Sequence, residues 1–225
     1  MRSTWIRQIS AIRKDGVESA INLTCGLNCV IGASNTGKTR IAKTVEFVCG
    51  GKETPFTDKT AYEVAQVTFI TNDGEVSLSR STRTQNTIHV ESSNPAVASG
   101  SYSVSSRSGK SINTVLLALL GIEPTRRIAT NETYHTVAFT WNAVRHLMLV
   151  PEDQVGRPQP SILFPKSTTL TTLTQSLSSL LVLVQDDKID SSIDRKRQRT
   201  SYPQKSRGTV HPPAIGRHRT PHQTP

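Results

Sequence analysis

The 225-residue sequence predicts an α/β fold, and three patterns favour that prediction. An apolar run at 27–31 enters a glycine-spaced loop, and a helical pattern follows the loop. Two apolar runs within 62–80 alternate with polar residues and meet at an Asn-Asp-Gly turn, which is a strong hairpin signal. The stretch "INTVLLALLGIEP" at 112–124 has the periodicity of an amphipathic helix, closed by a glycine and a proline. A sheet with helices packed on it accommodates all three patterns.

Shorter apolar runs predict the N-terminal strands. Residues 4–13 are typical of a first strand, and residues 21–24 of a second short one. The run at 27–31, "LNCVI", has the pattern of a strand buried on both faces. Because Cys25 and Cys29 bracket that strand, we expect both to be buried free thiols.

The rest of the chain adds further predicted elements. A helix follows the glycine-spaced loop and ends at Gly50-Gly51. The stretches "TIHVES" and "SYSVSS" suggest one or two more strands, and 143–150 has the pattern of a strand on which His146 is a packed or edge residue. Leucines from Leu170 onward fall on one helical face, which predicts a helical segment near 168–185.

The positive charge of the chain belongs to its C-terminal tail. The formal net charge is +10, but the residues from Arg195 onward contain eight Lys or Arg and no Asp or Glu, so the preceding part carries only +2. We therefore expect a folded lobe over 1–190 and a disordered, basic, Pro/Arg/His-rich tail over 191–225. The sequence has no signal-peptide pattern and no apolar stretch of membrane-spanning length, which favours a cytoplasmic protein with no membrane partner.

The glycine-spaced loop fits the pattern G-x-x-x-x-G-K-[ST] without a mismatch. Four residues between the glycines let successive main-chain N–H groups point toward an anion, and the following helix contributes its positive N-terminal end. The lysine can reach the β- and γ-phosphates of a nucleotide, and the threonine hydroxyl can bind Mg²⁺. The predicted phosphate-binding residues are Gly32, Ala33, Ser34, Asn35, Thr36, Gly37, Lys38 and Thr39.

The flanks of this loop resemble the N-terminal part of SMC/RecN/RecF-type ATPases, the ABC-like coiled-coil proteins of chromosome maintenance and DNA repair. Residues 26–32, "GLNCVIG", and the closing "FVCGG" at 47–51 match the layout of that family. The resemblance spans roughly 4–185 and is specific only over 20–51. It implies an incomplete P-loop NTPase lobe of the ABC/SMC type, with an antiparallel β hairpin layer, that binds ATP and Mg²⁺. In that family a basic residue also ends a hairpin like this one, so Arg80 either points toward the phosphates or is a solvated arginine.

Two departures from the family pattern affect the expected site. The loop has Ala33-Ser34-Asn35-Thr36 where the family usually has Pro-Asn-Gly in the middle, and Thr39 replaces the usual serine. The family also has a glutamine after a later strand that senses the metal and the γ-phosphate. The corresponding stretch here is "HLMLVPEDQVGR", in which Glu152 fills the best aligned position, Gln154 lies two residues on, and a plain loop is the alternative.

The sequence shows neither an LSGGQ-like signature nor a clear Walker B strand, both of which the family uses for hydrolysis. The nearest Walker B candidate is "LLVLVQDD" at 180–187, and the competing assignment makes it the end of the helix near 168–185. We therefore expect a truncated chain with little ATPase activity alone, needing a second lobe from a homodimer or from a C-terminal half. DNA would be a partner only of the complete protein.

Three rival functions stay open at this point. The chain is a complete small P-loop phosphotransferase or NTPase with Asp153 or Asp186 on the metal, an inactive truncated product, or a module that binds nucleic acid through its tail. Turnover by the isolated chain distinguishes the first rival from a half-head. Eight cations with Tyr202 as the tail's only aromatic residue would give sequence-independent phosphate contact at most.

Overall fold

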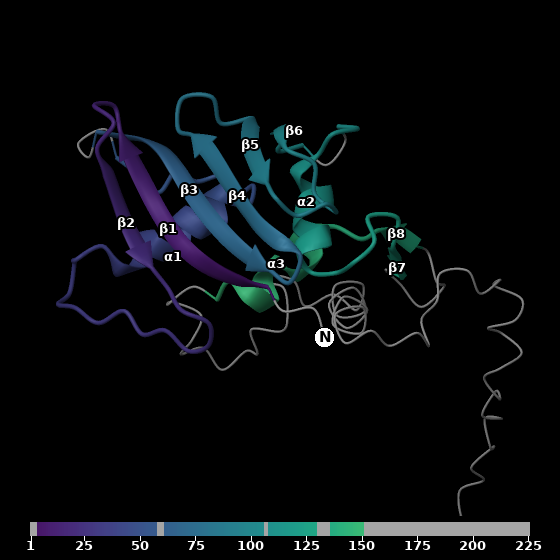
Figure 1. The fold of residues 1–225 in the computed structure, drawn as a ribbon, viewed down its shortest axis with the longest axis horizontal. Coiled ribbons are helices and arrows are strands. Elements are labelled where there is room, and N and C mark those ends of the chain that lie inside the picture. Colours follow the sequence, from purple (N-terminus) through teal and green to yellow (C-terminus); the bar gives the residue numbers. More distant parts are fainter. Residues whose placement is uncertain (1–3, 58–60, 106–107, 130–135, 151–225) are drawn as a thin grey trace, which may run out of the picture. The chain divides into compact units, whose positions relative to one another are not determined.

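The computed structural model describes residues 4–57, 61–105, 108–129 and 136–150. Their main feature is a six-stranded antiparallel sheet with the order β2-β1-β3-β4-β5-β6 (Figure 1). The strands are β1 (Trp5–Arg13), β2 (Glu18–Asn22), β3 (Tyr62–Thr71), β4 (Gly74–Ser81), β5 (Thr87–Ser92) and β6 (Gly100–Ser103). The helices are α1 (Lys38–Val48), α2 (Ile112–Leu119) and α3 (Trp141–Met148), and a small second sheet pairs β7 (Arg127–Ala129) with β8 (Thr136–Ala138).

The predicted hairpin at 62–80 is confirmed as β3 and β4. Thr71 and Gly74 are the last paired residues, so Asn72 and Asp73 form the two-residue connection. The Thr71 hydroxyl donates to the Gly74 carbonyl at 2.7 Å, which fixes this end of the hairpin. The strand predicted at 4–13 is confirmed as β1, and strands also form at "TIHVES" and "SYSVSS". The strand predicted at 21–24 forms earlier, as β2 over 18–22, and overlaps the prediction at two residues. The helix predicted over 112–124 forms as α2 over 112–119.

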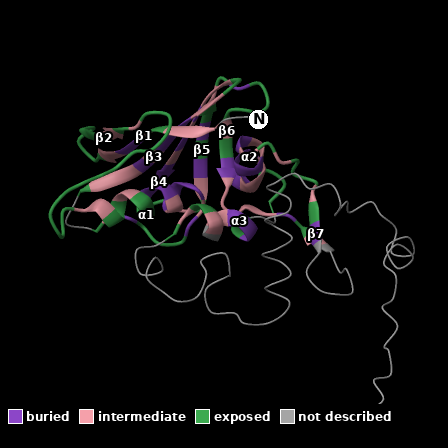
Figure 2. Ribbon diagram, turned by 90° about the horizontal axis from the view of Figure 1, so that it is seen from below, coloured by how far each residue is buried: buried purple, intermediate pink, exposed green. Residues whose placement is uncertain are grey.

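One face of the sheet carries the core. Val76 and Leu78 on β4 and Ile88 and Val90 on β5 alternate with polar residues and are almost fully buried. Helix α1 packs on β1, β3 and β4 through Val45, Phe47 and Val48, and α2 joins the same apolar cluster (Figure 2). Helix α1 is thus held against the sheet along its C-terminal half.

The expected strand at 27–31 does not form, and this is a correction to the sequence prediction. The last main-chain bond to β1 is donated by Leu23 to the Arg7 carbonyl at 2.8 Å, and the chain then leaves the sheet as a loop (Figure 1). Leu27 and Ile31 are each 93% exposed. Cys25 and Cys29 are exposed as well, so the prediction of buried thiols is wrong, while Cys49 is buried. A strand buried on both faces needs neighbours, and none of the described strands lies beside this segment.

The strand expected at 143–150 is also wrong, because residues 141–148 form helix α3. Ala143 and Val144 are buried in a second apolar cluster with Leu117, Ile128 and Phe139. A short apolar run is compatible with either a strand or a buried helical face, and here the packing against α2 and β7 decides for the helix. His146 therefore lies on a helix.

Several predictions fall outside the described residues. They concern Glu152, Gln154 and Asp153, the helical segment near 168–185, the Walker B candidate at 180–187 with Asp186, and the tail at 191–225. The chain divides into two units between Ser192 and Ile193, and every described residue belongs to the first unit. In the part of the chain that the structure describes, no helix has the length and apolar character needed to cross a bilayer.

Candidate phosphate-binding site

The predicted phosphate-binding loop lies between β2 and α1, at the N-terminal end of that helix. Residues 32–36 are exposed, Gly37 and Lys38 are partly buried, and α1 begins at Lys38 (Figure 2). Gly37 is the N-cap residue, and no side chain caps this end of the helix. The first N–H groups of a helix have no acceptor within the helix. A side chain often accepts from them, but none does so at the N-terminal end of α1.

The Lys38 side chain closes the loop into a ring. Its ammonium group donates to the Gly32 carbonyl at 2.9 Å and to the Ala33 carbonyl at 2.6 Å, and it lies 3.4 Å from the Thr36 hydroxyl. The Thr36 hydroxyl itself donates to the Ala33 carbonyl at 2.8 Å. The first and seventh residues of the motif are therefore joined, and a positive charge stands at the opening of the loop.

The backbone of the loop uses left-handed conformations at two positions. Asn35 has φ 62° and Gly37 has φ 90°, and a left-handed residue in such a turn directs neighbouring N–H groups to one concave side. Gly32 is needed for a different reason, because a Cβ atom there would lie 3.0 Å from the Thr36 hydroxyl oxygen. Both glycines of the motif thus have a steric or conformational role in the folded loop.

Thr39 is the residue that the sequence predicts to bind Mg²⁺. Thr39 is the second residue of α1 and is exposed next to the loop. Within the described ranges, no three His, Cys, Asp or Glu side chains gather to form a metal site. Mg²⁺ usually keeps several waters and takes one or two protein ligands together with phosphate oxygens, so one hydroxyl fits that donor set.

Arg80 occupies neither of the positions expected from the sequence. It is 3% exposed and lies at the C-terminal end of α1, opposite the phosphate loop. Its guanidinium donates to the Phe47 carbonyl, to the Gly51 carbonyl at 2.7 Å and to the Gln85 carbonyl at 2.6 and 2.8 Å. It also lies 4.0 Å from the centre of the Phe47 ring, a cation–π contact.

The role of Arg80 has a simple electrostatic basis. The last carbonyls of a helix lack intrahelical partners and carry the negative end of the helix dipole, which favours a cation. Burial lowers the pKa of the Arg80 guanidinium to about 10, and the group remains charged at neutral pH. One signal in the sequence places it inward, because Val76, Leu78 and Arg80 alternate on β4 and so share the buried face.

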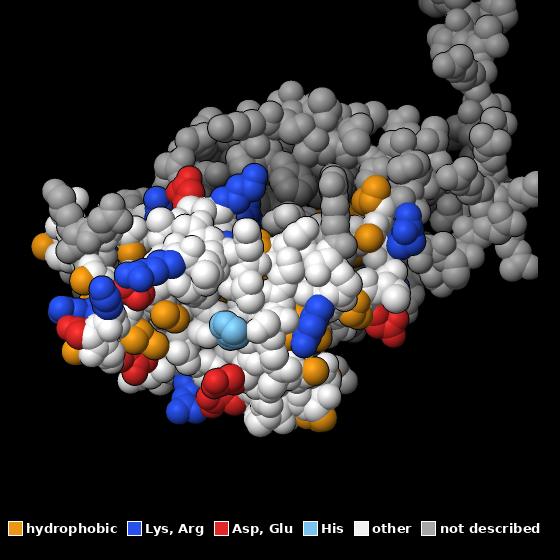
Figure 3. All heavy atoms as spheres, turned by 90° about the horizontal axis from the view of Figure 1, so that it is seen from above, with side chains coloured by type: hydrophobic (Ala, Val, Ile, Leu, Met, Phe, Trp, Pro, Cys, Tyr) orange, Lys and Arg blue, Asp and Glu red, His pale blue; other side chains and the backbone are white. Residues whose placement is uncertain are grey.

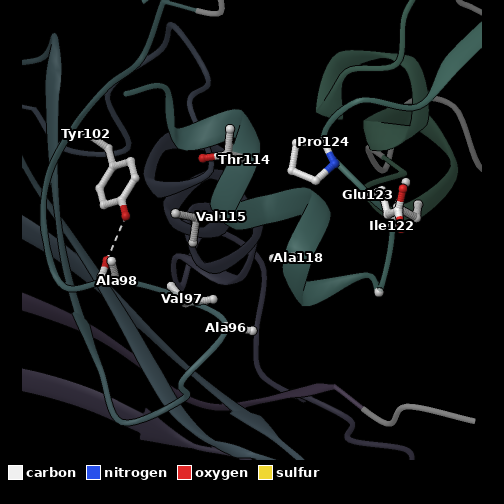
Figure 4. Close-up of a pocket in the computed structure, with 11 residues that line it drawn as sticks. Ala96, Val97, Ala98, Tyr102, Thr114, Val115, Ala118, Ile122, Glu123 and Pro124 are labelled. Atoms are coloured by element: carbon white, nitrogen blue, oxygen red, sulfur yellow. Dashed lines mark hydrogen bonds between the residues drawn. The ribbon is translucent and has the colours of Figure 1, made fainter. Parts of the chain in front are cut away.

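A pocket of about 300 Å³ lies elsewhere, between α2 and the segments before β6 and after α2 (Figure 4). The Tyr102 hydroxyl points into this region and donates to the Ala98 carbonyl at 2.7 Å. Among the described residues that line the pocket, Glu123 is the only charged one, and none is a cation that could bind a phosphate. The lining residues are Ala96, Val97, Ala98, Tyr102, Thr114, Val115, Ala118, Gly121, Ile122, Glu123 and Pro124.

On the face that Figure 3 presents, the Lys and Arg side chains of the described residues do not gather into one patch. Lys and Arg side chains there are scattered among acidic and uncharged residues. Two ion pairs of the described residues join Lys43 to Glu53 at 3.5 Å and Arg145 to Glu46 at 3.0 Å.

No protein-family model matches the chain, and no curated protein matches it significantly in sequence.

Proposed function

We propose that the chain is the ATP-binding N-terminal lobe of an SMC-like P-loop ATPase. The motif from Gly32 to Thr39 carries the proposal, and the ring that Lys38 closes supports it. In this assignment Lys38 neutralises phosphate charge, Thr39 binds Mg²⁺, and the main-chain N–H groups around Asn35 to Gly37 hold the phosphates. ATP is the nucleotide that the family resemblance favours.

The exposed apolar segment before the loop supports a requirement for a second lobe. Leu27, Val30 and Ile31 are 93%, 46% and 93% exposed. Clustered exposed apolar side chains commonly mark an interaction surface. We propose that a second ATPase lobe, from another copy or a separate half, covers this segment. Hydrolysis by one lobe alone would then be slow, because the water-activating carboxylates come from elsewhere.

The broader setting follows from the same resemblance. A lobe of this type would act in DNA repair or chromosome maintenance, with DNA bound by the assembled protein. Three free thiols, two of them exposed, suit a reducing compartment such as the cytoplasm. Glu152 or Gln154 would supply the group that senses the metal and the γ-phosphate.

The experiment is a titration of the full chain with ATP, with and without Mg²⁺. We expect saturable, Mg²⁺-dependent binding that Lys38→Ala weakens by about 10- to 100-fold, since a charged hydrogen-bond donor is lost. Lys43→Ala is the matched control, because Lys43 lies on the same helix and forms an exposed ion pair with Glu53. The control should bind ATP as the parent does.

Two results would contradict the proposal. Equal ATP affinity in the parent and in Lys38→Ala would remove the phosphate loop from consideration. Hydrolysis with a rate proportional to the concentration of the isolated chain, without an added partner, would favour the complete phosphotransferase instead.

A further inference from the structure

Two exposed thiols lie in the loop that precedes the phosphate-binding motif. Cys25 and Cys29 are four positions apart, and both are exposed. The Asn28 side chain folds this loop onto itself, since it accepts from the Thr24 N–H at 3.0 Å and donates to the Thr24 carbonyl at 2.7 Å. It also donates to the Gly26 carbonyl at 3.0 Å, and Gly26 turns the chain with φ 100°.

This folded loop and an extended strand differ in whether the two cysteines can meet. A disulfide requires Cα atoms about 4.4–6.8 Å apart. Four residues of extended strand separate the same atoms by about 13 Å, so a strand through this segment excludes the bond. The loop closed by Asn28 brings the chain at Thr24 back to Asn28 and removes that obstacle.

We infer that Cys25 and Cys29 form an oxidisable dithiol, a reversible modification site whose disulfide holds residues 24–29 in the looped conformation. The loop runs directly into Gly32, the first residue of the phosphate motif. A regulatory consequence rests on the proposed function. The bond restrains the segment that leads into Gly32 and that the second lobe is proposed to cover, so oxidation hinders both ATP binding and assembly.

The redox step needs an oxidant, and a peroxide supplies it. The thiolate of one cysteine attacks the peroxide, breaks its O–O bond, gives a sulfenic acid and releases hydroxide. The second thiolate attacks the sulfenic sulfur, forms the disulfide and releases a second hydroxide, so the two sulfurs lose two electrons and the peroxide gains them. The two hydroxides take up the protons that the two thiols lost and become water. A dithiol reductant reverses the bond through a mixed disulfide.

Peptide mapping of the full chain tests the dithiol without any nucleotide. The dilute protein is treated with hydrogen peroxide, alkylated and digested with trypsin. Cys25 and Cys29 fall in one peptide, residues 15–38, and Cys49 falls in another, residues 44–52. We expect the first peptide to lose two hydrogen atoms and to escape alkylation, while Cys49 stays a thiol. Dithiothreitol should restore the reduced peptide.

Asn28→Ala provides a variant that opens the loop and leaves both thiols in place. It should form the Cys25–Cys29 bond about tenfold more slowly, because the effective concentration of one thiol at the other falls. Intermolecular disulfides between dilute chains, overoxidation without a bond, or an unchanged rate in Asn28→Ala would each overturn the inference.

An ATP titration of the reduced and the oxidised chain then tests the regulatory part. We expect oxidation to weaken ATP binding about tenfold in the parent and not at all in the double variant Cys25→Ser, Cys29→Ser. Unchanged affinity in a chain that carries the disulfide would overturn the regulation alone. A reduced chain that binds no ATP would instead refute the proposed function, and the peptide result would still stand.

Discussion

The two ends of helix α1 are built in opposite ways. At the C-terminal end, Phe47 and Val48 are fully buried, and the Arg80 guanidinium binds the Phe47 and Gly51 carbonyls. At the N-terminal end, no side chain caps the helix and the loop from 32 to 36 is exposed. Protein groups thus bind the free carbonyls at the C-terminal end, whereas no side chain caps the N-terminal end.

This difference separates stability from binding along a single helix. Removing contacts at the buried end exposes carbonyls and disturbs packing on β4, so the free energy of unfolding should respond most strongly there. Changes at the loop end touch few other atoms and should alter ligand affinity instead. Substitutions at the C-terminal end should therefore change the free energy of unfolding, and substitutions at the loop end should change ligand affinity.

The largest stability effect should come from Arg80→Met. We expect a loss of about 3 kcal/mol in the free energy of unfolding, because the Gly51 and Gln85 carbonyls would lose the donors that Arg80 supplies and the Phe47 carbonyl would keep the Gly50 N–H but lose the guanidinium. Urea denaturation of the full chain followed by circular dichroism measures this loss. A change below about 0.5 kcal/mol would show that the C-terminal end of α1 does not depend on the arginine.

Arg83→Met is the matched control for that measurement. Arg83 follows the same strand but is 65% exposed at its side chain, and it pairs with the Glu63 carboxylate. An exposed ion pair contributes little, so the control should lose less than about 1 kcal/mol.

Several elements could be predicted because their signals are local. The β3–β4 hairpin follows from two-residue alternation around a turn, and α1 and α2 follow from apolar periodicity with glycines at their ends. The phosphate motif is equally local because its residues are contiguous, and its role in binding phosphate stays a prediction.

The sequence predictions that are wrong concern segments whose structure depends on distant neighbours. The run at 27–31 has the composition of a buried strand, but the described part of the chain gives it no neighbouring strand, and the Asn28 side chain binds the nearby backbone instead. Helix α3 and the capping role of Arg80 arise from contacts with residues distant in sequence. A sequence pattern limits such outcomes but does not choose between them.

Smaller losses in the free energy of unfolding are expected from replacing one glycine at each end of α1. A Cβ atom at Gly51 would lie 2.7 Å from the Glu46 carbonyl oxygen, so Gly51→Ala must move the backbone and should cost about 2 kcal/mol. A Cβ atom at Gly37 would meet nothing within 4 Å, and only the positive φ of 90° is strained, which should cost about 1 kcal/mol. Urea denaturation gives both values.

ATP titration of the same two variants should give the reverse order. Gly37→Ala should weaken binding, because the loop must change its backbone conformation, whereas Gly51→Ala should retain the parent's affinity once folded. If Gly51→Ala lost ATP affinity as strongly as Gly37→Ala, the two ends of the helix would not be independent.

The smallest effect is a pH dependence from Cys49, which lies at the C-terminal end of α1. Burial, with a smaller contribution from Glu46, raises the pKa of the Cys49 thiol from 9.0 to about 12. The raised value means that the folded state keeps this proton while the unfolded state releases it above about pH 9, so stability falls as the pH rises from 9 toward 12. At about pH 10 the loss should be about 1.4 kcal/mol.

Urea denaturation at about pH 8 and about pH 10 should show this loss in the parent and not in the control, Cys49→Ala. The control is less stable because it lacks the buried side chain, but that deficit is the same at both pH values. Equal pH responses in the two proteins would mean that water reaches the thiol, and the C-terminal end of α1 would then be more open than the contacts of Arg80 imply.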